Sequence, residues 1–428
     1  MLSVAYLANT YPSNVETYVG REIAELRRRN VRVIAGSIRK AKPPNPAPPV
    51  DVVVLRSIRR LFSLRALLIC IRHRKRIADL VRRAVWQGNE TTLQRVKTLL
   101  HTWLGACYAA DLQGRGVQHI HVHHGYFGAW VGMVAARLLR ISYSLTLHGS
   151  DLLIKRAYID TKLENCAFCL TISAYNRNYI VRHFPQIKPE KILVARLGVI
   201  VPEVLVSRPR SSPAPSEPRP FFRLLAVGRL HPVKDHAFLI RACARLCELG
   251  VRFECRIAGE GPERRSLQSL IHRTALESCA TLLGHASPSQ LDLLYESADL
   301  VALTSRSEGI PLVLMEAMAR GKIVLAPRIN GIPELVIAGR TGFLYEPGSM
   351  DDFLRQLLHI YALIHPQTPL TQPGPEICPS LSLAWMQHAG AVQVRHNFNQ
   401  PKNLHFFADS FINLIQRGAI PHANSLLQ

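Results

Sequence analysis

Two glutamates lie eight residues apart at an expected helix start, in the segment Ser305-Arg306-Ser307-Glu308-Gly309-Ile310-Pro311-Leu312-Val313-Leu314-Met315-Glu316. An apolar run typical of a strand ends near Thr304, and Pro311 suits the first turn of a helix. The free backbone N–H groups of such a helix start bind phosphate well. A carboxylate such as Glu316 can accept two hydrogen bonds from a vicinal diol, for instance that of a ribose. Taken alone, the pattern also fits an ordinary helix start whose acidic residues complement the helix dipole.

A second set of candidate residues follows the first strand of the same half, in Gly228-Arg229-Leu230-His231-Pro232-Val233-Lys234-Asp235. The cations Arg229 and Lys234 can neutralise a diphosphate as it leaves. On a basic protein, two surface cations are also unremarkable by themselves. Two further turns follow strands, Ala258-Gly259-Glu260-Gly261-Pro262 and Asn330-Gly331-Ile332-Pro333-Glu334. These loops all lie where strands are expected to end.

The elements that must position these loops are visible as short apolar runs that alternate with helical patterns. Such alternation argues for parallel sheets covered by helices on both faces. The sequence therefore predicts an α/β protein with two doubly wound, Rossmann-like domains that face each other across a cleft at the carboxyl ends of their strands. The expected strands are Leu2–Ala8, Val31–Ile38, Asp51–Leu55, Val117–His123, Tyr143–His148, Phe168–Ser173 and Lys191–Arg196, then Phe222–Val227, Arg252–Ala258, Ala280–Leu283, Leu300–Thr304 and Ile323–Ala326.

Proline-rich stretches mark the domain boundaries. Residues 202–220 contain six prolines and are typical of a linker. We expect an N-terminal domain over residues 1–201 and a C-terminal domain over residues 221–365. Residues 366–400 would form a second proline-rich connection that crosses back to the N-terminal domain. A final amphipathic helix at about residues 400–420 would complete the N-terminal domain.

The composition narrows the class of protein. The 428 residues are 48% hydrophobic and 19% charged, which excludes a disordered chain, and 25 Gly and 9 Cys exclude collagen-like and disulfide-scaffold chains. No apolar run reaches the about 20 residues of a membrane span, and the first residues lack the features of a signal peptide. The cysteines are odd in number and scattered, so a reducing cytoplasm is the expected location.

The charge is strongly positive, with 53 Lys+Arg against 30 Asp+Glu, a net +23. Residues 56–97, the basic block, hold 12 Lys+Arg against Asp79 and Glu90, so 12 − 2 leaves +10. Apolar residues interleave with these cations at helical spacing. The block fits a solvated helical face, a basic amphipathic helix on an anionic membrane surface, or a nucleic-acid contact. No zinc-finger, RNP-type or helix-turn-helix pattern supports nucleic acid.

The second half of the chain resembles the retaining glycosyltransferases of family 4, which have the GT-B fold. The resemblance covers Phe222 to about Leu357 and rests on motifs that occur in the family's order. The family's paired glutamates match Glu308 and Glu316, its Gly-Arg-Leu…Lys loop matches residues 228–234, and its Gly-x-Gly-Pro turn matches residues 259–262.

The first half is similar to a subgroup of this family that builds exopolysaccharides such as colanic acid. The similarity lies in Thr146-Leu147-His148-Gly149-Ser150-Asp151, in the segment from Pro12 to Ile23, in His119 to His124, and in Thr171 to Asn176. Asn14-Val15 departs from the subgroup pattern before Glu16, and the glycine-rich first loop of other family members is not found.

The resemblance implies roles for individual residues. Glu308 would contact the donor sugar, and His148 would approach it from the other domain; these are the expected catalytic residues. The weaker expectations for the acceptor side are Glu16, His123 and Asp151. The donor diphosphate and nucleotide would be held by Arg229, Lys234, Gly309, Ile310, Pro311, Leu312 and Glu316, with Glu316 on the ribose.

The resemblance also implies the reaction. A hexose would move from a nucleotide-diphosphate sugar to a lipid-linked or saccharide acceptor, with retention of configuration, in exopolysaccharide, capsule or lipopolysaccharide synthesis. No cofactor or metal is expected, because cations and a helix dipole stabilise the leaving diphosphate and no Asp-x-Asp motif is present. Cys166-x-x-Cys169 lacks a second ligand pair for zinc.

The expected location is the inner face of the cytoplasmic membrane, where the enzyme would bind peripherally through the basic block. Two other classes stay open: a catalytically inactive sugar-binding or scaffold member of the same fold and, with less support, a basic nucleic-acid-binding protein. No specific nucleic-acid partner is expected.

Overall fold

The computed structural model describes residues 1–13, 16–40, 50–55, 62–154, 156–202, 221–366 and 382–418. Several expectations lie outside these ranges: nearly all of the 202–220 linker, residues 367–381 of the second connection, Arg56, Arg59 and Arg60 of the basic block, and Asn14-Val15.

The chain divides into two compact units. The first holds Met1–Arg196 and Lys402–Gln428, and the second holds Leu197–Pro401. Helix α15, Leu383–Asn397, lies in the stretch that the sequence suggested as a connection, and it packs against α12, Leu312–Ala319, within the second unit.

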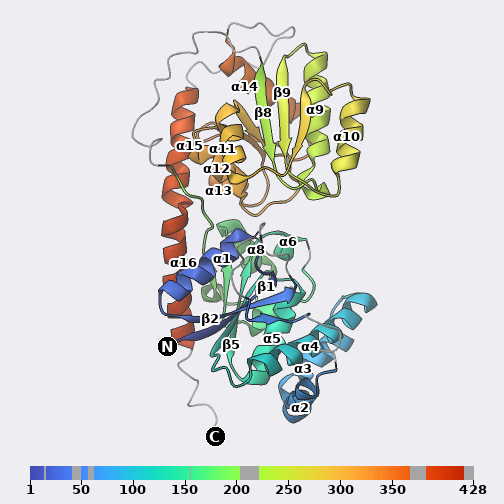
Figure 1. Ribbon diagram of the computed structural model, residues 1–428, viewed down its shortest axis with the longest axis vertical. Helices are drawn as coiled ribbons and strands as arrows, with labels where there is room; N and C mark the ends of the chain where they lie inside the picture. The colour runs from blue at the N-terminus through green and yellow to red at the C-terminus, as the bar shows by residue number, and fades with distance from the viewer. Residues whose placement is uncertain are drawn as a thin grey trace. The chain divides into compact units, whose positions relative to one another are not determined.

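The first unit is built on a seven-stranded parallel sheet in the order β3-β2-β1-β4-β5-β6-β7 (Figure 1). From β1 the chain adds β2 and β3 on one side and then β4 to β7 on the other, as in a doubly wound sheet. Each strand falls within two residues of an expected one or inside it. The strands are β1 Ser3–Thr10, β2 Arg32–Arg39, β3 Val52–Val53, β4 His119–His123, β5 Ser142–Leu147, β6 Phe168–Thr171 and β7 Ile192–Val194.

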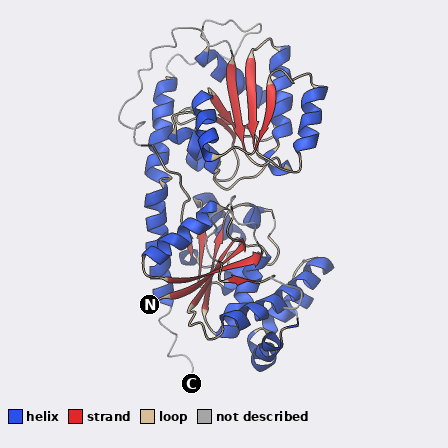
Figure 2. Ribbon diagram, in the orientation of Figure 1, coloured by secondary structure: helices blue, strands red, loops and turns tan. Residues whose placement is uncertain are grey.

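Helices cover both faces of this sheet (Figure 2). The core between α4, α5 and the strands is rich in Ala and β-branched residues, and Gly105 of α4 lies so close to α5 that a Cβ would meet Val134 at 2.7 Å. The helices are α1 Thr17–Arg28, α2 Leu64–His73, α3 Ala78–Trp86, α4 Thr92–Leu112, α5 Phe127–Leu139, α6 Ser150–Leu153, α7 Ile159–Asn165 and α8 Ala174–His183.

The C-terminal helix α16, Gln400–Gly418, packs on the first sheet. Phe411 of this helix is fully buried and meets the ring of His121 edge-on, with 5.0 Å between ring centroids. Phe407 and Ile415, one helical turn before and after Phe411, are buried in the same cluster.

The second unit holds a six-stranded parallel sheet in the order β10-β9-β8-β11-β12-β13. The sequence analysis missed β13, whose three residues are too few to show a period. The strands are β8 Phe222–Val227, β9 Phe253–Ala258, β10 Ala280–Gly284, β11 Leu300–Ala302, β12 Ile323–Pro327 and β13 Phe343–Tyr345.

The remaining helices cover this second sheet on both faces. They are α9 His236–Glu248, α10 Arg264–Arg273, α11 Pro288–Ser297, α12, α13 Ile332–Leu335, α14 Met350–Ile364 and α15. Helix α11 starts with a capping box formed by Ser287 and Gln290. Together the two sheets confirm the predicted α/β fold with two Rossmann-like domains.

None of the helices in the described ranges has the length and apolar character needed to cross a membrane.

Candidate active site

The loops of the second unit are held together by backbone contacts that only glycine permits. A Cβ on Gly259 would meet Gly228 O at 1.8 Å, and a Cβ on Gly261 would meet Leu230 O at 2.2 Å. Leu230 N donates to Glu260 O at 2.9 Å, and Glu263 N donates to Leu230 O at 3.0 Å. The Gly-x-Gly-Pro turn is therefore the platform on which the Gly-Arg-Leu loop lies.

Lys234, in the loop after β8, forms an ion pair with Glu308, in the loop after β11. Lys234 Nζ donates to Glu308 Oε1 at 2.5 Å, and Ser305 Oγ donates to the same oxygen at 2.7 Å. The two charged side chains are 18% and 13% exposed, so the pair is mostly shielded from water but still accessible. The structure thus joins two residues that the sequence could only place on separate loops.

Helix α12 begins at Leu312, four residues after Glu308. Pro311 is its N-cap, with φ −76° and ψ 125°, so the helix starts one residue later than the expected first-turn proline. The first N–H groups of a helix have no acceptor inside it, and here they belong to Leu312 and Val313. Gly309 and both helix residues are partly exposed, whereas Ile310 and Pro311 are buried. The helix start can therefore offer N–H groups to an anion.

Glu316 lies on α12 and is oriented by a buried tyrosine. Tyr295 OH, on α11, donates to Glu316 Oε2 at 2.9 Å, and the Tyr295 side chain is 1% exposed. Arg320 Nη1 donates to the Glu316 backbone oxygen at 2.9 Å. One carboxylate oxygen is thus fixed against the protein core, which leaves the carboxylate positioned to accept from a diol.

Three residues that sequence reasoning missed support these loops. Arg306 Nε donates to Asp235 Oδ2 at 2.7 Å, and Arg306 N donates to Val233 O at 2.8 Å, so it ties the Glu308 loop to the Lys234 loop. Asn330 Nδ2 donates to Glu308 O at 2.9 Å. Tyr295 is the third. Arg306 and Asn330 lie in segments that the sequence singled out, but they were given no role there, and Tyr295 lies in none of these segments. Arg229 is exposed on the surface of its loop.

In the first unit, Asp151 holds the loop that carries His148. Asp151 is fully buried, and its carboxylate accepts from the backbone N–H groups of Gly125, His148 and Gly149 at 2.9, 3.1 and 2.9 Å. Asn176 Nδ2 donates to the His148 backbone oxygen. Asp151 was expected on the acceptor side, but its burial and its backbone contacts make it a residue that positions His148.

His124, which the sequence analysis did not single out, joins the other expected residues. Its Nε2 lies 3.1 Å from Glu16 Oε1, and its Nδ1 lies 3.6 Å from Asp151 Oδ2. Burial alone would lower the pKa of His124, but hydrogen bonds with Asp151 and Glu16, and their charges, raise it to about 10. For Asp151, burial would raise the pKa, but His124 holds it well below its ordinary range.

His123 lies between Glu22 and His148. Its Nε2 is 2.6 Å from Glu22 Oε2, and its Nδ1 is 3.0 Å from His148 Nε2. The ring nitrogens of His123, His124 and His148 lie within 4.8 Å of one another, a spacing that a metal ion could use. The ring nitrogens of His123 and His124 all face protein partners, so hydrogen bonds and ion pairs already satisfy these two rings.

The described part of the basic block, residues 62–97, includes α2, a short 3-10 turn at Arg74–Arg76, α3 and the start of α4, and the three α-helices lie beside one another in Figure 1. Its exposed cations are Arg65, Arg72, Arg74, Lys75, Arg82 and Lys97. Large apolar side chains are exposed among them: Phe62, Leu64, Leu67, Leu68, Ile71, Trp86, Leu93 and Val96. We refer to these exposed residues as the basic apolar face.

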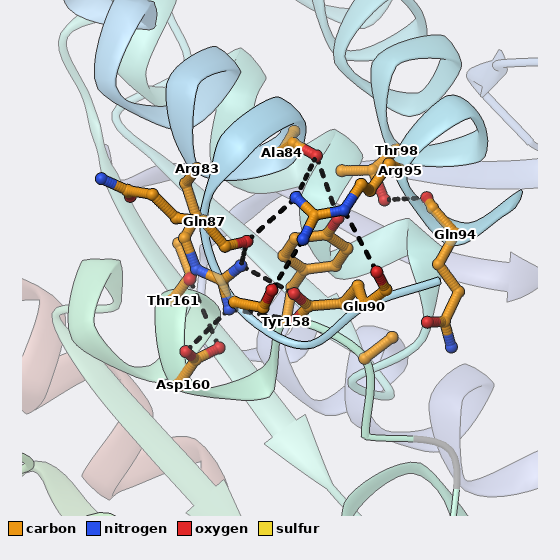
Figure 3. A network of polar contacts seen from close by, with 12 residues as sticks. Arg83, Ala84, Gln87, Glu90, Gln94, Arg95, Thr98, Tyr158, Asp160 and Thr161 are labelled. Carbon is orange, nitrogen blue, oxygen red and sulfur yellow. Dashed lines mark hydrogen bonds and ion pairs between the residues drawn. The ribbon is translucent and has the colours of Figure 1, made fainter. Parts of the chain in front are cut away.

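Other cations of the block serve the fold. Arg83 donates to Glu90 at 2.8 Å and to Asp160 at 3.0 Å, and Arg95 donates to the backbone oxygens of Val85 and Gly88 at 2.9 and 2.6 Å (Figure 3). These contacts fix the turn between α3 and α4. The full charge of the block is therefore not available to a partner.

Comparison with known proteins agrees with this arrangement. Residues 208–363 match the family described as glycosyl transferases group 1. A protein of Escherichia coli strain K12, named as a colanic acid biosynthesis glycosyltransferase, WcaL, is 38% identical over 161 residues, which are 36% of this chain and 38% of WcaL. The amylovoran biosynthesis glycosyltransferase AmsK of Erwinia amylovora is 30% identical over 271 residues, 60% of this chain and 64% of AmsK. The matched stretches thus span less than two thirds of these relatives.

Solved structures share the fold of the whole chain. Sucrose-phosphate synthase of Thermosynechococcus elongatus superposes with a TM-score of 0.69 at 16% identity and covers 98% of this chain and 100% of that one. Anabaena HepE, in complex with UDP and glucose, gives a TM-score of 0.64 at 18% identity and covers 96% and 100%. Residues 208–363 of this chain therefore match the glycosyl transferases group 1 family, and the chain shares with the solved structures the GT-B fold of two Rossmann-like domains.

Proposed function

We propose that this chain is a retaining, metal-independent hexosyltransferase that uses a nucleotide-diphosphate sugar and extends a lipid-linked or saccharide acceptor in exopolysaccharide, capsule or lipopolysaccharide synthesis. The observation that carries the proposal is the contact of Lys234 with Glu308 four residues before the start of α12, with Glu316 oriented by Tyr295 on the same helix. The printed names of WcaL and AmsK support the exopolysaccharide context.

Each donor group would meet a residue of matching chemistry. Lys234, Arg229 and the N–H groups at the start of α12 would bind the diphosphate, because cations and a helix N-terminus both stabilise phosphate charge. Glu316 would accept from the ribose hydroxyls, and Glu308 would contact the donor sugar. His148 and the residues around it in the first unit would contact the sugar or the acceptor.

The reaction would go by attack of the acceptor oxygen on the face that the diphosphate leaves. The C1–O bond to the diphosphate breaks, the bond to the acceptor oxygen forms, and the leaving diphosphate takes the acceptor proton. Negative charge grows on the diphosphate during this step, so Lys234, Arg229 and the α12 start would lower the barrier electrostatically.

The direct test is turnover of UDP-, GDP- and ADP-sugars by the purified full-length protein, with and without EDTA, and NMR of the anomeric proton of the sugar product. We expect turnover of one donor class, unchanged by EDTA, with the α configuration of an α-linked donor kept in the product. Loss of activity with EDTA would contradict metal independence, and inversion would contradict the mechanism. Binding without turnover would favour an inactive sugar-binding member of the fold.

We further propose that the basic apolar face docks the enzyme on an anionic membrane surface. On α2, Leu64, Leu67, Leu68 and Ile71 recur at helical spacing and are all exposed, while Ala66 and Ile69 of the same helix are buried in the core of the first unit. A cationic rim around an exposed apolar stripe fits the headgroup region of anionic lipid.

Sedimentation with vesicles of phosphatidylglycerol and phosphatidylcholine tests this docking. Replacement of Arg72, Arg74 and Lys75 by Gln should remove about 1 kcal/mol each, in total on the order of 100-fold in partitioning at low salt. The control is Arg245→Gln with Arg273→Gln and Arg340→Gln, a matched charge change in the second unit. Equal binding by the two triple variants, or equal binding to neutral vesicles, would overturn the proposal.

A further inference from the structure

Three histidines alternate along β4, and the last of them, His123, contacts His148. His119, His121 and His123 are all 0% exposed. His121 contacts hydroxyls of β5, with Nδ1 2.7 Å from Ser144 Oγ and Nε2 3.0 Å from Thr146 Oγ1. His123 has a different environment, because it meets a carboxylate on one side and another imidazole on the other.

The hydrogen-bond chain from Glu22 to His148 has a direction. An ionised carboxylate only accepts hydrogen bonds. Glu22 Oε2 contacts the hydroxyl of Tyr6 and Nε2 of His123, so both of these groups donate to it. In a neutral imidazole one nitrogen donates and the other accepts, so His123 Nδ1 is then an acceptor. Nε2 of His148, 3.0 Å away, must donate to it.

We propose that Glu22 and His123 fix His148 in the Nε2-protonated tautomer, so that its Nδ1 presents a lone pair to the substrate. This inference rests on the proposed function, and it deepens it by naming a substrate class. A lone pair accepts a hydrogen bond from a sugar hydroxyl and repels a carboxylate. The site would therefore select a neutral hexose over the corresponding uronic acid. Glu22 and His123 are positioning residues in this arrangement.

The surroundings of His148 keep Nδ1 available. Among the described residues, the side chain of His148 has one hydrogen-bond partner, Nδ1 of His123, and His148 is 9% exposed. The ring of Tyr18 lies 5.0 Å and the ring of His124 lies 4.4 Å from the His148 ring, between centroids. These contacts fix the plane of the ring without occupying its second nitrogen.

Titratable groups of opposite effect surround His148, and burial decides in favour of its neutral form. They come from α1, from β4 with the residue after it, and from α6: Glu16, Tyr18, Glu22, His121, His123, His124 and Asp151. Burial, and next the charge of His124, lower the pKa of His148 well below its ordinary value. A neutral His148 has a definite tautomer, and the chain from Glu22 selects which one.

The competing arrangement has a protonated His123 that donates from both nitrogens. His148 Nε2 would then accept, and His148 Nδ1–H would donate to the substrate. That tautomer would favour a carboxylate or phosphate over a hydroxyl, so the two arrangements differ in an observable way.

The test is long-range ¹H–¹⁵N correlation NMR of the full-length chain labelled at histidine, with the His148 signals identified by their loss in His148→Gln. We expect Nε2 protonated and Nδ1 unprotonated in the wild type. A protonated Nδ1 would overturn the inference. This spectrum needs no donor, so it decides the tautomer whether or not the proposed reaction is found.

Variants extend the test. His123→Leu removes the acceptor and should mix the His148 tautomers, whereas His123→Asn places an amide oxygen near the former Nδ1 and should keep part of the wild-type state. His121→Leu is the matched control, because it replaces a neighbouring buried imidazole whose hydrogen-bond partners are Ser144 and Thr146 and not His148. Unchanged His148 signals in a folded His123→Leu protein would contradict the role of His123.

Kinetics with the established donor and its uronic acid counterpart complete the experiment. His123→Leu should lower kcat about 10-fold, the value of one lost hydrogen bond, with a smaller change in donor KM, and His123→Asn should recover part of it. Equal use of the uronic acid by the wild type would refute the substrate class, even where the tautomer is as expected.

Discussion

The pairing of Lys234 with Glu308 predicts that two changes at the donor site act in opposite directions. In the free protein Lys234 Nζ is bound to Glu308 Oε1 at 2.5 Å. A diphosphate must therefore compete with Glu308 for the lysine. Glu308→Gln removes the competing charge, and Lys234→Met removes the group for which both compete.

The magnitude follows from the partial burial of the pair. With side chains 18% and 13% exposed, it lies between a surface pair, worth about 0–1 kcal/mol, and a buried pair, whose disruption costs about 3–5 kcal/mol. A contribution of about 1 kcal/mol from release of the lysine makes Glu308→Gln bind a nucleoside diphosphate about 5-fold more tightly. Loss of a charge-assisted hydrogen bond, about 1.5–3 kcal/mol, makes Lys234→Met bind it about 10- to 100-fold more weakly.

Isothermal titration calorimetry with the nucleoside diphosphate of the established donor measures both effects. Glu248→Gln is the control for net charge, because Glu248 is 61% exposed on α9 and pairs only with Arg245 among the described residues. Glu308→Gln should also lose transfer activity, since Glu308 is proposed to contact the sugar. If Glu308→Gln and Lys234→Met weaken diphosphate binding equally, competition for the lysine is refuted.

Three further changes test the supports of the site. Gly259→Ala should destabilise the protein by about 1–3 kcal/mol more than Gly250→Ala, as measured by urea unfolding. A Cβ at position 259 would meet Gly228 O at 1.8 Å, whereas Gly250, also at positive φ, faces open space. Tyr295→Phe removes the hydrogen bond that holds Glu316, and it should lower the free energy of unfolding by about 1 kcal/mol. It should also weaken the binding of a nucleoside diphosphate but not that of inorganic diphosphate, which calorimetry with both ligands measures. The pKa of His124 is raised to about 10, so its contribution to the free energy of unfolding is complete below about pH 6.5 and is lost as the pH rises through 10. In urea unfolding, the difference in stability between the wild type and His124→Gln should therefore shrink between these two pH values.

The sequence predicted the fold well because each strand is a short apolar run with clear punctuation. Strand β8 was predicted with its observed bounds, and α12 was predicted within one residue of its start. Strand β13 was missed because three residues carry no period, and α15 was missed because it follows a proline-rich stretch that suggested only a connection.

The candidate site was predictable in its motifs but not in its contacts. Spacing placed Lys234 and Glu308 on loops at strand ends, yet only the structure shows their ion pair. Asp151 illustrates the limit. The resemblance implies a place for Asp151 on the acceptor side, and the structure shows that its carboxylate oxygens accept from backbone N–H groups. Glu22 lies in the Pro12 to Ile23 segment but was given no role, Tyr295 lies outside the motifs, and both act through partners that are distant along the chain.

The most direct measurement of the central claim is binding of UDP, GDP and ADP, each with its 2′-deoxy analogue, to the wild type and to Glu316→Gln. The account predicts that one ribonucleotide binds in the presence of EDTA, that its deoxy analogue binds more weakly, and that Glu316→Gln removes this difference because Glu316 reads the ribose diol. Absence of binding by all three, or a ribose preference that survives in Glu316→Gln, would contradict a nucleotide-sugar site at α12.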